Sequence, residues 1–228
     1  MPEAPGPRRP SPGGPIRRWR IRRRLFATFE GHATADRRAL PIRRTVRGIW
    51  VATPVRVIEA AAGILSAAGL LGRSAGTGSA PYHVIDAGSG DGRVPAVIAW
   101  LVPGQAVLGI EADAMLHARA RAQLDALGAA GVIDPAHVRL AAGDYCDPET
   151  YGAQGIALGR TRLVLNYPDG NQHRLARFVA TRCPPETTLA LLTHDRDLSV
   201  DALPLRARQD VRAGNGPPWS LSLYRRSG

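Results

Sequence analysis

The stretch HVIDAGSGDGRV, from His83 to Val94, decides the fold. An apolar run leads into a turn that contains three glycines and two aspartates, and a helical pattern follows. Glycine lets a backbone turn tightly and approach a ligand closely, because no Cβ stands in the way. In a doubly wound sheet, the first strand-to-helix turn approaches the ligand most closely. The stretch therefore predicts an α/β domain whose ligand lies at this turn.

The rest of the chain repeats this alternation of strand and helix. Apolar runs predict strands at residues 83–87, 106–110, 138–141, 162–165 and 188–192, and helical spacing appears at 93–101, 114–127 and 171–181. Such alternation builds a mostly parallel sheet with helices on both faces. The end of the chain, ALPLRARQDVRAGNGPPWSLSLYRR, instead predicts two strands joined by a Gly/Pro turn. We therefore expect a Rossmann-like sheet that a C-terminal antiparallel hairpin completes.

The charges around the glycine turn indicate the kind of ligand. A dinucleotide fingerprint, G-x-G-x-x-G, would place its third glycine where this chain has Arg93. Asp86 and Asp91 flank the turn and would repel a pyrophosphate. Carboxylates at this place favour a ligand with a positive end, such as an ammonium or a sulfonium. The turn thus argues against a nicotinamide-dependent oxidoreductase.

Two further strands end in acidic residues. Glu111 ends the second predicted strand, where its carboxylate can accept hydrogen bonds from both hydroxyls of a ribose. Asp144 follows the third strand, placed to accept from an adenine amino group while Tyr145 covers the ring. Each acid has a simpler explanation as well, since Glu111 and Asp144 could cap helices and Asp86 could be a turn residue. Together they predict a nucleoside site.

These motifs resemble those of the class I S-adenosylmethionine-dependent methyltransferases: VIDAGSGDGRV is similar to the first motif, LGIEAD to the second and AAGDY to the third. WVATPVRVIEAAAGIL, upstream, is similar to the branch that includes the ATP-synthase c-subunit lysine methyltransferases. The resemblance covers residues 49–192 and implies S-adenosylmethionine as cofactor, with residues 50–53 as a flap over its methionine end. The cofactor contacts that we expect are Trp50, Thr53, Asp86, Gly88, Ser89, Gly90, Asp91, Arg93, Glu111, Asp113, Asp144, Tyr145 and Asn166.

The methyl acceptor should lie at the ends of the fourth and fifth strands. The fourth ends in LVLNYPDGN, where Asn166, Tyr167 and Asp169 are candidate acceptor contacts, although an ordinary turn explains them too. Enzymes that methylate amino groups of nucleic acids carry Asn/Asp-Pro-Pro-aromatic at this place, and the order here differs. After the fifth strand, His194 or Asp195 could act as a general base if the acceptor is a hydroxyl or an ammonium. We expect a small molecule or a protein side chain as acceptor.

Most of the net charge of +11 lies near the N-terminus. Residues 1–50 contain 13 arginines and three acids, whereas residues 51–228 are close to neutral. Residues 1–15 are rich in proline and glycine and predict a disordered tail. Residues 16–48 form a basic segment whose start, IRRWRIRRRLFATF, predicts an amphipathic helix with Trp19, Phe26 and Phe29 near one side. Residues 49–228 then form the methyltransferase domain.

The basic segment leaves a second function open. It could bind RNA, an anionic surface or an acidic partner, and the chain would then be a binding protein that keeps the fold without turnover. It could also be a helix that lies on its own domain. The two cysteines, Cys146 and Cys183, fit neither a disulfide framework nor a metal site. No apolar run is long enough to span a membrane, so we expect a cytoplasmic protein.

Overall fold

The computed structural model describes residues 14–31, 42–45, 48–72, 84–214 and 218–226. Of the predicted tail at residues 1–15, all but the last two residues lie outside this part of the chain. Its elements alternate as predicted from residue 84 onward, and each predicted strand and helix is present with small shifts at its ends. None of the described helices is long and apolar enough to cross a membrane.

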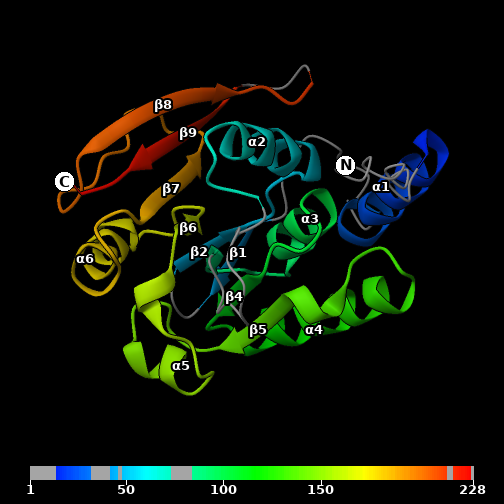
Figure 1. Cartoon of the computed structure of the whole chain (residues 1–228), viewed down its shortest axis with the longest axis horizontal. Coiled ribbons are helices and arrows are strands. Elements are labelled where there is room, and N and C mark those ends of the chain that lie inside the picture. Colours follow the sequence, from blue (N-terminus) through cyan, green and yellow to red (C-terminus); the bar gives the residue numbers. More distant parts are fainter. Residues whose placement is uncertain (1–13, 32–41, 46–47, 73–83, 215–217, 227–228) are drawn as a thin grey trace, which may run out of the picture.

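Seven strands form the central sheet in the order β5-β4-β3-β6-β7-β9-β8 (Figure 1). The strands β5, β4, β3, β6 and β7 run parallel to one another, and β9 runs antiparallel to both β7 and β8. The strands are β3 (Val84–Ala87), β4 (Val107–Glu111), β5 (Val138–Ala142), β6 (Leu163–Asn166), β7 (Thr188–Thr193), β8 (Leu205–Val211) and β9 (Trp219–Tyr224). The predicted Rossmann-like fold with a C-terminal hairpin is therefore confirmed. Strand order reverses at β3, which places a ligand crevice at its carboxyl end.

Helices cover both faces of the sheet (Figure 1). One face carries α2 (Val55–Ala67), α3 (Arg93–Leu101) and α4 (Ala114–Ala129), and the other carries α5 (Pro148–Gly152) and α6 (Gln172–Arg182). Short 3-10 turns, η1 (Pro135–His137) and η2 (Leu158–Arg160), precede β5 and β6. Because both faces are covered, every residue of β3, β4, β6, β7 and β9 is buried. This explains why these strands appear in the sequence as unbroken apolar runs.

The N-terminal segment packs on this domain. In α1 (Pro15–Glu30), Leu25 and Phe29 are buried against α2, α3 and α4, so the predicted amphipathic helix is present. Trp19 differs from the prediction, because it is 58% exposed and only the second half of the helix is packed. The Glu30 carboxylate accepts a hydrogen bond of 2.7 Å from the Val55 amide at the start of α2. The end of α1 is thereby fixed beside the sheet.

In the sequence, a two-stranded ribbon follows α1 and precedes α2. It consists of β1 (Ile42–Thr45) and β2 (Gly48–Val51), paired antiparallel. The pairing crosses the predicted boundary between residues 48 and 49, so backbone hydrogen bonds join part of the basic segment to the segment that follows it. Gly48 has φ +145°, and a Cβ there would lie 2.2 Å from the Asp169 carbonyl oxygen. The ribbon therefore approaches the end of β6 as closely as a backbone can.

Candidate functional site

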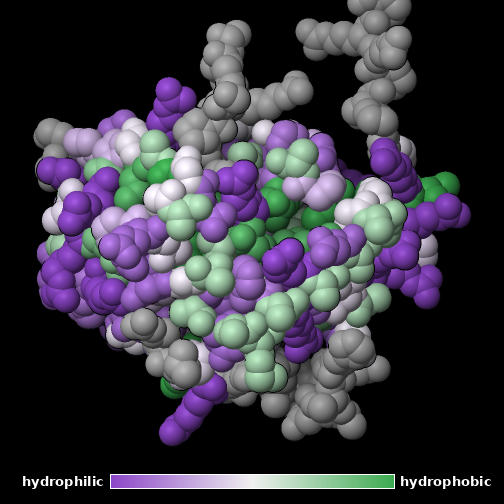
Figure 2. All heavy atoms as spheres, turned by 90° about the horizontal axis from the view of Figure 1, so that it is seen from below, coloured by the Kyte–Doolittle hydropathy of each residue, from purple (hydrophilic) through white to green (hydrophobic). Residues whose placement is uncertain are grey.

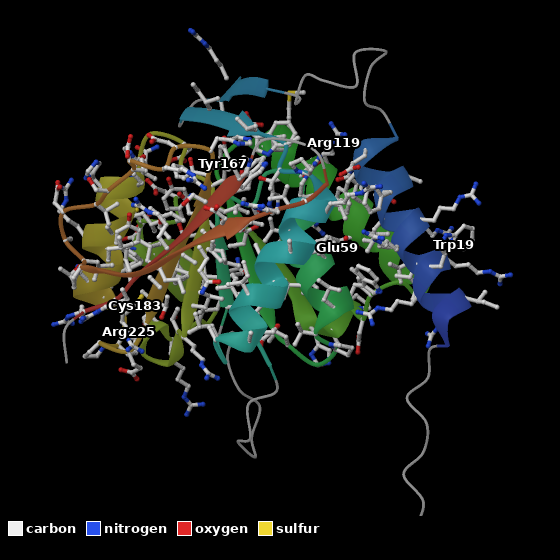
Figure 3. The ribbon with its side chains drawn as sticks, turned by 90° about the horizontal axis from the view of Figure 1, so that it is seen from above. Trp19, Glu59, Arg119, Tyr167, Cys183 and Arg225 are labelled. Carbon is white, nitrogen blue, oxygen red and sulfur yellow. The ribbon has the colours of Figure 1, made fainter. Side chains whose placement is uncertain are left out.

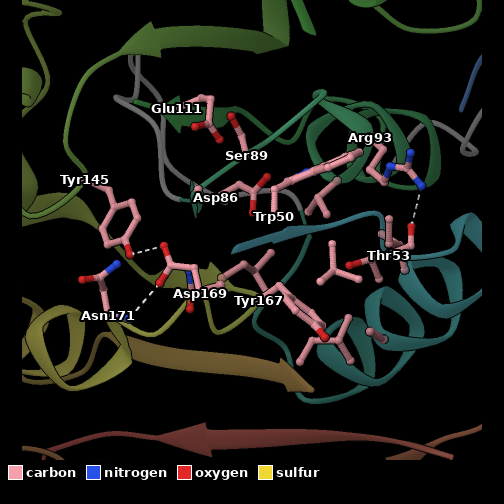
Figure 4. A pocket seen from close by; sticks show the side chains of 18 of the residues that line it. Trp50, Thr53, Asp86, Ser89, Arg93, Glu111, Tyr145, Tyr167, Asp169 and Asn171 are labelled. Atoms are coloured by element: carbon pink, nitrogen blue, oxygen red, sulfur yellow. Dashed lines mark hydrogen bonds between the residues drawn. The ribbon is translucent and has the colours of Figure 1, made fainter. Parts of the chain in front are cut away.

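A pocket lies where β3, β4, β5 and β6 end, and the β1–β2 ribbon covers part of it (Figure 4). Its lining includes twelve of the predicted site residues: Trp50, Thr53, Asp86, Gly88, Ser89, Arg93, Glu111, Asp144, Tyr145, Asn166, Tyr167 and Asp169. The strand ends therefore bring together the residues that the three motifs singled out. One side of this pocket is polar and rich in carboxylates, and the other is apolar.

Asp86 is the most unusual group in the pocket. Its side chain is buried, its Oδ2 atom has no hydrogen-bond partner among the described residues, and no cation stands beside it. Burial, together with the nearby carboxylates of Glu111 and Asp91, raises the pKa of Asp86 to about 8. A buried carboxyl group of this kind gains most from a ligand that brings a positive charge.

Glu111 faces Asp86 across the glycine turn (Figure 4). Its Oε2 atom accepts a hydrogen bond of 2.7 Å from the Gly90 amide, and its Oε1 atom accepts one of 2.8 Å from the Asp113 amide. Burial raises the pKa of Glu111, while these backbone hydrogen bonds oppose the shift. The two amides fix the carboxylate in one orientation, and each oxygen keeps a further lone pair for a hydroxyl group.

Two more buried polar atoms of the pocket lack a partner among the described residues, Ser89 Oγ and Asn166 Oδ1. The Asn166 amide nitrogen donates a hydrogen bond of 2.7 Å to the Ala87 carbonyl, which directs its oxygen away from β3. Buried polar groups without partners are rare in folded proteins, and several in one pocket favour a binding site for a polar ligand. With Asp86, they present mainly acceptors, which suits a ligand rich in donors.

The ends of β5 and β6 are tied to each other. The Tyr145 hydroxyl donates to Asp169 Oδ2 at 2.7 Å, while Asp169 Oδ1 accepts from the Asn171 amide (Figure 4). Burial raises the pKa of Tyr145, and the Asp169 carboxylate adds to the shift, so this hydroxyl stays protonated. Asp144 forms an ion pair of 2.8 Å with Arg174. Our sequence analysis did not identify Asn171, which lies two residues after Asp169 in the same loop, or Arg174, whose partner Asp144 follows a different strand.

Arg93 connects the glycine turn to the N-terminal elements. Its guanidinium binds both carboxylate oxygens of Asp91 and donates to the carbonyls of Thr53 and Phe29. The Phe29 and Trp50 rings lie 5.6 and 5.8 Å from it. Arg93 therefore joins α1, the residues before α2 and the turn in one buried cluster, and four of its five N–H donors are already used there.

Trp50 reaches the turn from the ribbon. A Cβ on Gly90, whose φ is +55°, would lie 2.0 Å from Trp50 Nε1, so only glycine lets the indole rest on this turn. The indole and Thr53 both line the pocket. Residues 50–53 accordingly lie where the resemblance places a flap.

Four predicted site residues fall outside the pocket lining: Gly90, whose amide donates to Glu111, and Asp91, Asp113 and His194. Asp91 is fully buried and is neutralised by Arg93. Asp113 caps α4, where its carboxylate accepts hydrogen bonds from the amides of Met115 and Leu116. His194 is exposed and packs on Trp219 with ring centroids 3.8 Å apart, and burial by its neighbours lowers its pKa. For Asp91, Asp113 and His194 the simpler structural role explains the residue, so we no longer assign these three to the site.

The described residues hold no cluster of three or more histidine, cysteine or acidic side chains that could bind a metal ion. Cys146 and Cys183 are both unpaired thiols.

No family model matches the sequence, and no curated protein matches it. Solved structures share its fold. A candidate O-methyltransferase from Klebsiella pneumoniae has 15% identity and a TM-score of 0.55, over 95% of this chain and 92% of its own. The rRNA methyltransferase aviRa from Streptomyces viridochromogenes has 19% identity and a TM-score of 0.53, over 77% and 86%. A mutant of MtNAS in complex with S-adenosylmethionine has 14% identity and a TM-score of 0.54, over 75% and 62%.

The fold is thus the α/β fold found in class I S-adenosylmethionine-dependent methyltransferases. Two of these neighbours, an rRNA methyltransferase and a candidate O-methyltransferase, differ in the acceptor that their names indicate, so the shared fold does not identify a substrate for this chain. The narrower resemblance to the branch of the ATP-synthase c-subunit lysine methyltransferases finds no support among them.

Proposed function

We propose that this chain is an S-adenosylmethionine-dependent methyltransferase. The observation that carries the proposal is the buried Asp86 carboxyl group, whose Oδ2 lacks a partner and whose pKa is raised to about 8, in a pocket at the switch point of the sheet. A carboxylate in this environment is matched by the ammonium group of a methionine moiety. The neighbour in complex with S-adenosylmethionine has the same fold, which agrees with this assignment.

The other polar groups fit the rest of this cofactor. Glu111 is fixed by two backbone amides and offers its remaining lone pairs to the ribose hydroxyls. Asp144 and Tyr145 stand at the next strand end, where the adenine would lie. Ser89 supplies one hydroxyl that can donate or accept. Charge-assisted hydrogen bonds of this kind contribute about 1.5–3 kcal/mol each.

A nicotinamide dinucleotide fits less well. Its pyrophosphate would meet the carboxylates of Asp86 and Glu111, and the one arginine at the turn, Arg93, already binds Asp91. Repulsion between buried like charges is costly because no water screens it.

When bound, S-adenosylmethionine supplies a methyl group on a sulfonium, which is an electrophile without further activation. The residues of this chain then need to orient the acceptor, to exclude water and to hold both partners in line. Asn166, Tyr167 and Asp169 lie at the end of β6 and line the same pocket, so we assign the acceptor to their side. Residues 50–53, which include the lining residues Trp50 and Thr53, would exclude water from the pocket.

Calorimetric titration tests the cofactor. We expect the full chain to bind S-adenosylmethionine and S-adenosylhomocysteine with micromolar affinity and to bind NAD far more weakly. Binding of NAD in preference to both, or binding of none of the three, would contradict the proposal. Transfer of a labelled methyl group from the bound cofactor then separates an enzyme from a binding protein without turnover.

A further inference from the structure

The second side of the pocket is apolar and continues from the end of β6 to α2. Three strands and two helices contribute to it, and most of its side chains are buried. The lining residues of this apolar side are Ile58, Ala61, Ala62, Leu65, Val94, Ile98, Leu165, Leu192 and Leu221. We call this set the apolar slot. In Figure 4, Tyr167 points from the end of β6 toward these side chains and away from Asp86 and Glu111.

Small residues on α2 leave room in the slot. Ala61 and Ala62 are buried on the face of α2 that is turned to the sheet, where Ile58 and Leu65 stand one turn away on either side. Protein interiors are normally packed without voids, so the space beside these two alanines is unusual. Larger side chains at these two positions would reach into the pocket.

The charges around the pocket argue against a phosphorylated acceptor. Its lining contains two arginines, and each is already paired with a carboxylate: Arg93 with Asp91 at 2.7 Å and Arg174 with Asp144 at 2.8 Å. A nucleotide acceptor would place its phosphates near Asp169 and Asp144 without a spare cation among the described lining residues. This favours an uncharged acceptor.

One polar atom marks where the acceptor's reactive group would lie. Asn166 is 3% exposed, and its Oδ1 atom has no hydrogen-bond partner. It is the last residue of β6, directly after Leu165 of the apolar slot, and it lines the same pocket as the carboxylates. An amide oxygen accepts hydrogen bonds, so its natural partner is a hydroxyl or amino group.

Building on the proposed function, we propose that the methyl acceptor is a small molecule with an apolar body and one hydroxyl or amino group. The body packs in the apolar slot, and the hydroxyl or amino group donates to Asn166 Oδ1. On methylation, the acceptor oxygen or nitrogen forms the new bond to carbon and loses its proton to water, while the sulfur of the cofactor keeps the electron pair of the broken bond.

Binding of a neutral fluorescent probe tests the slot without relying on turnover. We would titrate the full chain, saturated with S-adenosylhomocysteine, with N-phenyl-1-naphthylamine, and displace the probe with straight-chain alcohols from butanol to octanol. Each added methylene should tighten binding about three- to fourfold until the slot is full, as expected for burial of apolar surface. Affinities that do not depend on chain length would overturn the proposal, and so would displacement by an RNA oligonucleotide or a lysine peptide but not by alcohols.

A matched pair of variants locates the binding. Ala62→Leu fills the slot and should weaken octanol binding at least about tenfold, whereas Ala67→Leu makes the same change at an exposed position of α2 and should leave it unchanged. Ala62→Val is the milder variant if leucine prevents folding. Equal octanol affinity in all three variants would refute the slot as the site.

Cofactor binding separates the two proposals. S-adenosylhomocysteine should bind the Ala62 variants and the unmodified chain alike. If it fails to bind the unmodified chain, the proposed function is wrong; if it binds and the alcohols do not, only the acceptor class is wrong.

Discussion

The protein carries two regions of concentrated charge, which differ in the sign of the charge, in their location and in their burial. The pocket gathers four carboxylates, Asp86, Glu111, Asp144 and Asp169, at the ends of four strands. Helix α1 gathers arginines, six of them between residues 17 and 24, at the edge of the domain. In the space-filling view, hydrophilic side chains cover most of the α1 end of the molecule, at the right (Figure 2).

Burial separates these two regions. The carboxylates of Asp86 and Glu111 are held in fixed positions below the surface, where a charge without a partner is costly. The arginines of α1 are mostly exposed, and Trp19 points away from the domain among them (Figure 3). Water solvates an exposed charge at little cost, so a run of arginines needs no ligand. A buried carboxyl group with an unpartnered oxygen does call for one, and we therefore locate the function in the pocket.

Asp86→Asn should produce the largest effect. The amide keeps the shape but loses the charge that would meet the ammonium group, so we expect S-adenosylmethionine to bind about 100-fold more weakly. The same change should raise the melting temperature of the ligand-free protein at pH 8, because it removes a buried carboxyl group that is costly to ionise. Calorimetry and thermal unfolding measure the two effects. Weaker binding together with a lower melting temperature would indicate mere structural damage.

Glu111→Gln should weaken S-adenosylmethionine binding about tenfold, because the hydroxyls of the ribose would meet a neutral group in place of a carboxylate. Asp113→Ala is the matched control, since this acid lies two residues further on and caps α4 outside the pocket. The control should lower the free energy of unfolding by about 1 kcal/mol and leave the affinity unchanged. A larger loss of affinity in Asp113→Ala than in Glu111→Gln would reverse our assignment of the two acids.

Cofactor binding should depend on pH through Asp86. Its pKa in the ligand-free protein is about 8, so the carboxyl group is protonated at lower pH and must lose that proton when the ammonium group binds. We expect affinity to rise severalfold between pH 7 and pH 8 and to level off above this range. In Asp86→Asn the pH dependence over this interval should vanish. Equal slopes in both proteins would assign the titration to another group.

The stability of the ligand-free protein should follow the opposite trend. The pKa of Asp86 is higher in the folded state than in the unfolded state, so the folded state binds the additional proton between about pH 4 and pH 8. The contribution of this residue to the free energy of unfolding is therefore largest at low pH and is lost as the pH rises through 8.

The sequence predicted the sheet, the glycine turn and most of the polar side of the pocket, because each depends on a short stretch of chain. VIDAG and VLGIE contain both the strand and the acid at its end, so Asp86 and Glu111 could be placed from local patterns alone. The structural role of Asp91 could not be predicted from a local pattern. Its partner Arg93 also binds the carbonyls of Thr53 and Phe29, which lie 40 and 64 residues before Arg93 in the sequence.

The apolar slot was missed for a different reason. An Ala/Leu/Ile-rich helix such as α2 has the same pattern whether its inner face fills a core or lines a pocket. Only the positions of the strands opposite Ala61 and Ala62 decide between the two. The contact of His194 with Trp219 could not be predicted either, because the pairing of β7 with β9 brings together residues that are far apart in the sequence.

Replacing arginines of α1 should have the smallest effect on cofactor binding in the pocket. This prediction tests directly whether the two charged regions are independent. Replacing Arg20, Arg23 and Arg24 by glutamine should change the affinity for S-adenosylmethionine less than about twofold, because none of them lines the pocket. The same triple variant should weaken binding of a single-stranded RNA and flatten its salt dependence if α1 binds nucleic acid. Arg22→Gln is the control, since Arg22 already pairs with Glu59 at 2.8 Å and should matter more for the packing of α1 than for RNA. A large loss of cofactor affinity in the triple variant would show that α1 acts on the pocket through the cluster around Arg93, and the two regions would then form one site.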